Sequence, residues 1–201
     1  MNIVDFKSIK TTRIAILGDL ETAKKVWVVL HGYGQLVQFF IRKFRVLENN
    51  GIAVIAPEAQ SRFYNNGFSG RVGATWMTKE DRETDIKDYL NYLDEVYHKF
   101  KLEKKDVTLL GFSQGGATAS RWNAQNPDYF SKFILWASVF PDDFDMKKID
   151  NSKNLFVMGN EDEFMNESKV EIISKMKENK VPFLIFNGGH DIYPDVLMKC
   201  I

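Results

Sequence analysis

Short apolar runs alternate with longer segments of helical periodicity along the whole chain. Several of the runs have no polar interruption, which is typical of strands buried on both faces of a sheet. The pattern predicts strands over residues 12–18, 25–32, 52–58, 107–111, 132–138, 154–159 and 181–188.

The segments between these runs predict helices. The clearest covers residues 78–100, where apolar residues recur on one stripe at helical spacing. Thr78 and Asp81, three residues apart, resemble a capping box at its start. Further helices are expected at 39–51, directly after Ser113, at 166–178 and close to the C-terminus.

Strands separated by helices indicate βαβ crossovers, and therefore an α/β fold with a mostly parallel sheet and helices on both faces. The chain has no internal repeat and no Pro/Gly/Ser-rich linker, so we expect one domain over residues 1–201. In such sheets, functional side chains gather where the strands end. A chemically useful residue should therefore directly follow a strand.

Composition and charge narrow the function classes. Lys plus Arg balance Asp plus Glu at 27 each, so no overall positive charge favours nucleic acid or anionic lipid. The N-terminus lacks the pattern of a signal peptide, and no apolar run is long enough to insert stably in a membrane. The single cysteine, Cys200, fits a reducing compartment. We expect a soluble cytoplasmic protein.

Ser113 stands between glycines in the segment "GFSQGG" (111–116), directly after a predicted strand and before a helix. The pattern G-x-S-x-G in this context is the nucleophile elbow, a tight turn that exposes the serine hydroxyl. The glycines at 111 and 115 leave room for the neighbouring backbone. The alternative is that Ser113 only caps the following helix.

A serine nucleophile needs a base to accept its proton. Of the three histidines, His98 lies within the long predicted helix, and His31 follows a strand but precedes the serine. His190, in "NGGHD", follows the strand 181–188 and comes after Ser113. It is the best candidate base, although a histidine in a plain turn would give the same pattern.

The base in turn needs a carboxylate that orients its ring. The segment "GNEDEF" (159–164) follows the strand 154–159 and offers Glu161, Asp162 and Glu163. We favour Asp162, but the pattern alone does not separate three carboxylates in one loop.

An acyl-transfer reaction also needs backbone N–H groups that stabilise the oxyanion. One is expected from Gln114, the residue after the serine, and the second from the loop "LHGYGQ" (30–35), with Tyr33 as donor. The alternative for this loop is an ordinary glycine turn.

Residues 57–77 form no clear periodic pattern and predict a long loop that overhangs the site. Its aromatic residues, together with Phe112, are candidates to contact an acyl or alkyl group. Arg62 and Arg71 are candidates to bind a carboxylate or phosphate. The alternative is that the aromatic rings pack the loop onto the protein and the arginines pair with nearby acids. The candidate substrate-binding residues are Trp76, Phe112 and Phe68.

The motifs "LHGYGQ", "GFSQGGATA", "GNEDEF" and "NGGHD" together resemble the carboxylesterase/phospholipase family of α/β-hydrolases, which includes acyl-protein thioesterases and lysophospholipases. The resemblance extends from about Val26 to about Asp195 in matching order. It implies the α/β-hydrolase fold. Few residues separate the strands between 137 and 154, so we expect no helical cap domain.

The resemblance implies Ser113 as nucleophile, Asp162 as acid, His190 as base, and the Tyr33 and Gln114 amides as oxyanion hole. A tryptophan near the active site of the family corresponds to Trp76. This chain departs from the family at Gln35, where Asp or Gly is frequent. It departs again after the acid, where "EFM" (163–165) replaces a hydrophobic pair and proline.

These observations predict a serine hydrolase that cleaves small-molecule carboxylic esters or thioesters. No metal-ligand spacing and no dinucleotide-binding motif is present in the sequence, so we expect neither a metal nor an organic cofactor. The alternatives are a non-catalytic binding protein with a hydrolase fold and a small serine peptidase.

Overall fold

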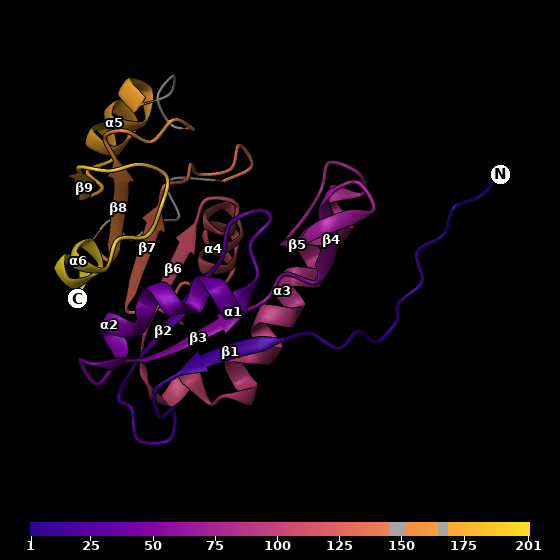
Figure 1. Ribbon diagram of the computed structural model, residues 1–201, viewed down its shortest axis with the longest axis horizontal. Helices are drawn as coiled ribbons and strands as arrows, with labels where there is room; N and C mark the ends of the chain where they lie inside the picture. Colours follow the sequence, from indigo (N-terminus) through magenta and orange to yellow (C-terminus); the bar gives the residue numbers. More distant parts are fainter. Residues whose placement is uncertain (145–151, 165–168) are drawn as a thin grey trace.

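Within the part of the chain that the structure describes, the central sheet has seven strands in the order β1-β3-β2-β6-β7-β8-β9. The computed structural model describes residues 1–144, 152–164 and 169–201 (Figure 1). All neighbouring strands are parallel except the edge strand β1, which pairs antiparallel with β3. The strands are β1 (Ile14–Leu17), β2 (Lys25–Leu30), β3 (Ala53–Pro57), β6 (Asp106–Phe112), β7 (Lys132–Trp136), β8 (Asn154–Gly159) and β9 (Phe183–Phe186).

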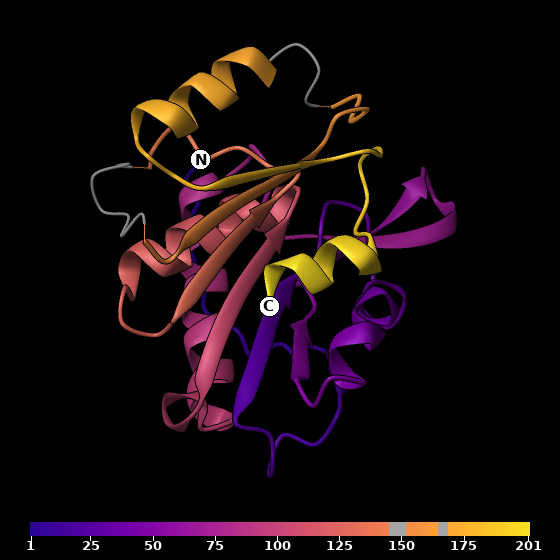
Figure 2. The same cartoon turned by 90° about the vertical axis from the view of Figure 1, so that its left-hand side faces the viewer.

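Two hydrophobic cores lie on opposite faces of this sheet, with helices over both (Figure 2). Side chains along β2 alternate between them, as the pleat of a strand requires: Val28 points to one core and Val29 to the other. The first core is covered by α3 (Arg82–Lys99), α4 (Gln114–Gln125) and α5 (Lys169–Glu178). The second is covered by α1 (Val37–Phe40), η1 (Ile41–Phe44), α2 (Arg45–Glu48), α6 (Pro194–Leu197) and η4 (Met198–Cys200). The predicted fold class is confirmed.

The prediction of a long loop over residues 57–77 is wrong. The segment forms an antiparallel hairpin of β4 (Ser61–Asn66) and β5 (Ser69–Thr75) that projects from the body (Figure 1). Most of its side chains are exposed on both faces, so the two strands show no alternation of buried and exposed positions. The turn consists of Gly67 and Phe68, since Asn66 pairs with Ser69, and Gly67 at its first position adopts a φ of 56°, which favours glycine.

The start of the long helix also differs from the prediction. α3 begins at Arg82, and no side chain caps it. The Thr78 hydroxyl donates to the Glu80 carbonyl, and the backbone N–H of Thr78 donates to Asp85 Oδ2. The expected capping box therefore does not form, because Thr78 lies four residues before Arg82, the first residue of the helix.

Two further boundaries differ. The helix predicted over 39–51 is three short turns, α1, η1 and α2, because a 3-10 turn interrupts the α-helical pattern. The helix predicted over 166–178 is seen as α5 from Lys169; residues 165–168 lie outside the described residues. Residues 145–151, in the region where no cap domain is expected, also lie outside them.

Candidate active site

Ser113 occupies a strained turn between β6 and α4. Its φ of 53° and ψ of −123° fall outside the regions that L-residues favour. The Ser113 N–H donates to the Trp136 carbonyl (3.0 Å), and the Gly116 N–H donates to the Ser113 carbonyl (2.8 Å). These hydrogen bonds hold the serine at the carboxyl end of the sheet, as the nucleophile elbow predicts.

The glycines that flank Ser113 are required by close backbone contacts. A Cβ on Gly111 would lie 2.5 Å from the Gly115 carbonyl oxygen, and a Cβ on Gly115 would lie 2.3 Å from the Leu30 carbonyl oxygen. Any side chain at either position would separate β6, α4 and β2. The expectation that these glycines leave room for backbone agrees with this geometry.

His190 lies between Ser113 and Asp162. Its Nε2 is 3.0 Å from Ser113 Oγ, and its Nδ1 is 2.8 Å from Asp162 Oδ2. Asp162 is buried, and its other oxygen accepts the Phe164 N–H (3.0 Å). An ionised Asp162 accepts the Nδ1 proton, so Nε2 is free to accept a proton from the serine. The structure thus brings together three residues from three separate loops.

The two rival carboxylates lie elsewhere. Glu161 and Glu163 are exposed, whereas Asp162 points inward to the imidazole. His98 also lies elsewhere: it is exposed on α3, and its Nε2 is 3.1 Å from the Tyr129 hydroxyl.

The loops that bear Asp162 and His190 are joined directly. Asn160 Oδ1 accepts the Gly188 N–H (3.1 Å), and the Glu161 N–H donates to the Gly188 carbonyl (3.0 Å). A Cβ on Gly159 would lie 2.1 Å from the Gly188 carbonyl oxygen. Sequence reasoning missed Asn160 as a residue that fixes the spacing between the two loops.

The His190 loop is anchored on its other side as well. Trp136 Nε1 donates to the Asp191 carbonyl (2.9 Å), and Lys43 from η1 forms an ion pair with the Asp191 carboxylate (2.6 Å). These contacts fix the backbone directly after the histidine.

The loop 31–35 lies beside the elbow. Gln35 Oε1 accepts the Gly32 N–H (2.9 Å), and the Gly34 N–H donates to Ala74 on β5 (2.9 Å). Among the described residues, the N–H groups of Tyr33 and Gln114 have no acceptor. Their role as an oxyanion hole stays a prediction.

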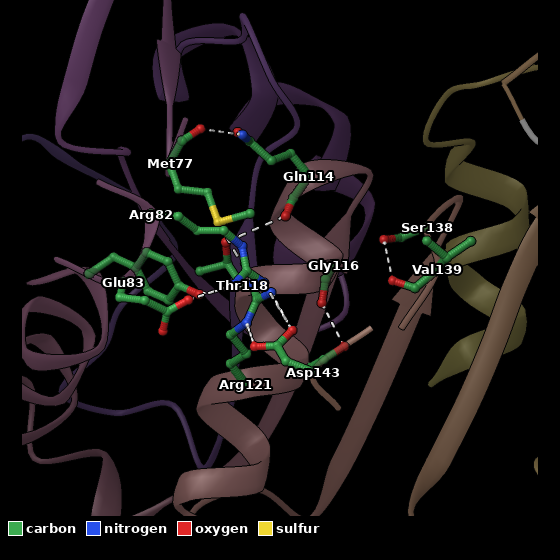
Figure 3. Close-up of polar contacts among 12 residues, drawn as sticks. Met77, Arg82, Glu83, Gln114, Gly116, Thr118, Arg121, Ser138, Val139 and Asp143 are labelled. Carbon is green, nitrogen blue, oxygen red and sulfur yellow. Dashed lines mark hydrogen bonds and ion pairs between the residues drawn. The ribbon is translucent and has the colours of Figure 1, made fainter. Parts of the chain in front are cut away.

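The Gln114 side chain connects the elbow to the base of the hairpin. Its Nε2 donates to the Met77 carbonyl (3.0 Å), a contact visible in Figure 3, and its Oε1 accepts the Trp76 N–H (3.1 Å). The turn that bears the serine and the end of β5 are thus held in one hydrogen-bond network.

His31 is a buried structural residue of this network. Its Nε2 accepts the Ala59 N–H (3.0 Å), so Nδ1 bears the proton that is donated to the Gly32 carbonyl (2.8 Å). Burial lowers the pKa of His31 to about 4, although the Gly32 carbonyl and Glu58 oppose this shift. The ring is therefore neutral at pH 7.

The three candidate substrate-binding residues lie in different environments. Trp76 is buried, and its Nε1 donates to the His31 carbonyl (2.8 Å). Phe112 is buried beside His190, and Phe68 is fully exposed at the hairpin turn. Trp76 supports the loop 31–35, and Phe112 supports the His190 imidazole. Contact of the three residues with substrate stays a prediction.

Arg62 binds a protein carboxylate, in agreement with the alternative expectation that the arginines pair with nearby acids. Glu58 is completely buried at the end of β3 and binds both Arg62 (2.7 Å) and Arg13 (2.7 Å). Burial alone would raise the pKa of Glu58, but the hydrogen bonds from the two arginines outweigh it and the pKa is lowered. This cluster fastens the hairpin to the edge of the sheet.

The sequence profile of the serine hydrolase (FSH1) family matches residues 21–194. The chain belongs to this family. The predicted serine hydrolase is thus confirmed at the level of the family, and Ser113 lies within the matched residues. No curated protein matches the sequence.

Solved structures of similar fold support the α/β-hydrolase architecture of this serine hydrolase. Esterase PE8 has a TM-score of 0.70 at 21% identity, with 96% of each chain covered. A phospholipase/carboxylesterase from Dyadobacter fermentans has a TM-score of 0.65 at 19% identity, with 96% of each chain covered. Acyl-protein thioesterase 2 from Zea mays has a TM-score of 0.67 at 19% identity, with 94% of this chain and 96% of that chain covered.

In the described part of the serine hydrolase, no helix is both long enough and apolar enough to cross a membrane. The absence of cofactors and nucleic acid partners, the single domain and the cytoplasmic location stay predictions.

Proposed function

We propose that the protein hydrolyses small-molecule carboxylic esters or thioesters through an acyl-enzyme on Ser113. The observation that supports this best is the continuous hydrogen-bond chain from Ser113 through His190 to Asp162, with contacts of 3.0 and 2.8 Å. The structural neighbours include an esterase and an acyl-protein thioesterase, which agrees with this class of reaction.

In the acylation step, Ser113 Oγ attacks the substrate carbonyl carbon while His190 Nε2 accepts the hydroxyl proton. The buried Asp162 keeps the proton of the imidazole on Nδ1 and stabilises the imidazolium. The bond from the carbonyl carbon to the leaving oxygen or sulfur then breaks, and His190 returns the proton to the leaving group.

The oxyanion is stabilised by the amides of Tyr33 and Gln114, which have no acceptor among the described residues. Gln114 is also the first residue of α4, where the helix dipole favours negative charge. In deacylation, His190 takes a proton from water, and the water oxygen attacks the acyl carbon. The acid leaves and Ser113 regains its proton.

The test compares the wild type with Ser113→Ala on p-nitrophenyl esters of increasing acyl length. We expect a loss of about 10⁴- to 10⁶-fold in kcat, because the nucleophile is absent. Ser131→Ala is the matched control, since Ser131 lies directly before β7, at the opposite end of the strand from the site.

Labelling by a fluorophosphonate should require Ser113. If the wild type hydrolyses no ester or thioester and is not labelled, the protein is a binding protein and the proposal is wrong. Faster hydrolysis of peptide anilides than of esters would indicate a peptidase. Matched oxygen and sulfur esters of one acyl group distinguish an esterase from a thioesterase.

A further inference from the structure

Phe164 lies directly over the histidine of the site. Its ring centroid is 4.7 Å from the His190 ring centroid, with the planes inclined by 56°. Its backbone N–H donates to Asp162 Oδ1 (3.0 Å). The carboxylate that orients His190 therefore also holds the backbone of Phe164 in place. The ring is nevertheless 73% exposed.

His190 has a second aromatic neighbour with a different environment. The Phe112 ring centroid lies 4.9 Å from that of His190, and Phe112 is 2% exposed. Phe112 therefore uses its surface to pack the imidazole against the protein. Phe164 contacts the same ring but leaves most of its own apolar surface free for another molecule.

The position of Phe164 indicates which part of a substrate it meets. His190 Nε2 must come within hydrogen-bond distance of the leaving atom in order to protonate it. The carbonyl oxygen is directed instead to the amides of Tyr33 and Gln114. Of the two aromatic rings against His190, Phe164 alone has exposed surface with which to meet the alcohol or thiol part of the substrate.

We propose that Phe164 is a specificity-determining residue that contacts the leaving group, and that the enzyme favours esters or thioesters with an apolar or aromatic alcohol or thiol. This inference rests on the function proposed above. An aromatic leaving group would bury the exposed ring of Phe164, whereas a small polar one would leave it in water.

The test uses acetates of alcohols with similar acidity, so that the intrinsic reactivity of the esters is nearly constant. The substrates are 2-methoxyethyl, benzyl and 1-naphthylmethyl acetate, and acid release is measured. Phe164→Ala should lower kcat/KM for the two aromatic esters by roughly 10-fold, mainly through KM, and change the methoxyethyl ester by less than about 2-fold.

Two further variants make the result specific. Phe164→Tyr keeps the ring and should keep the preference for aromatic alcohols. Phe6→Ala removes a phenylalanine that is 90% exposed in the segment before β1, and it should behave as the wild type.

The inference is wrong if Phe164→Ala lowers kcat by the same factor for all three esters and shifts the pH profile, because Phe164 would then act on His190. It is also wrong if none of the three rates changes. In both cases hydrolysis that depends on Ser113 would leave the proposed function intact. If Ser113→Ala hydrolyses the esters as fast as the wild type, the proposed function itself fails, and this inference fails with it.

Discussion

Acidification should weaken the fold through His31, the buried histidine beside the oxyanion loop. Its side chain is inaccessible to solvent, and burial lowers its pKa from the usual 6.5 to about 4. The unfolded chain takes up this proton near pH 6.5, whereas the folded chain takes it up only near pH 4. Between these values the unfolded state binds more protons, so the free energy of unfolding falls as the pH falls.

The size of the effect follows from the same two values. A difference of one pKa unit corresponds to about 1.4 kcal/mol, so the step from 6.5 to about 4 corresponds to about 3 kcal/mol. The contribution is complete above pH 6.5 and is lost as the pH approaches 4. A protonated ring could no longer accept the Ala59 N–H, which gives the loss a structural cause.

The assay is urea denaturation at about pH 7 and about pH 4.2 for the wild type and for His31→Asn. Carboxylates such as Asp143 and Glu58 contribute to both proteins, so the difference between the two pH dependences reports on His31. The wild type should lose about 3 kcal/mol more than the variant.

Val28→Ala is the matched control, because it removes buried volume from β2 without removing a titratable group. It should be destabilised at both pH values and keep the wild-type pH dependence. Equal losses in the wild type and His31→Asn would refute the reasoning, since the proton uptake would then not involve His31.

Two other substitutions test contacts of α4. Gly115→Ala would place a Cβ 2.3 Å from the Leu30 carbonyl oxygen, so we expect loss of fluorophosphonate labelling, measured beside the circular dichroism that reports whether the variant folds. Asp143→Asn leaves the buried Arg121 guanidinium (Figure 3) without its carboxylate partner, which lies 2.6 Å away. We expect a loss of about 2 kcal/mol in urea denaturation, less than for a fully buried pair because the Asp143 side chain is 42% exposed. No change in labelling or in stability, respectively, would contradict these expectations.

The positions of Ser113 and His190 at the sheet edge could be predicted because each follows a buried strand. Parallel strands bring their carboxyl ends to one edge, so two residues 77 positions apart in sequence can meet there. The sequence could not decide between Asp162 and its two acidic neighbours. Which carboxylate points inward depends on contacts with the distant loop at Gly188, and no local pattern encodes those contacts.

The hairpin β4–β5 and the role of Phe164 could not be predicted for a related reason. Hydrophobic periodicity detects a strand only when one of its faces is buried, and most side chains of this hairpin face solvent. In the sequence, Phe164 is an isolated aromatic residue that belongs to no periodic pattern. Its contact with His190 arises only because the loops that bear Asp162 and His190 come together in the fold. Tertiary contacts rather than propensities decide both features.

The strained backbone of Ser113 bears on how this sequence is maintained. A non-glycine residue in that conformation costs about 1 to 3 kcal/mol, and glycine would relieve most of it. Selection for stability alone would therefore favour glycine at position 113. If Ser113 is the nucleophile proposed above, its hydroxyl is what opposes that selection. In a lineage that no longer needs the reaction, selection for stability should then favour replacement of Ser113 by glycine.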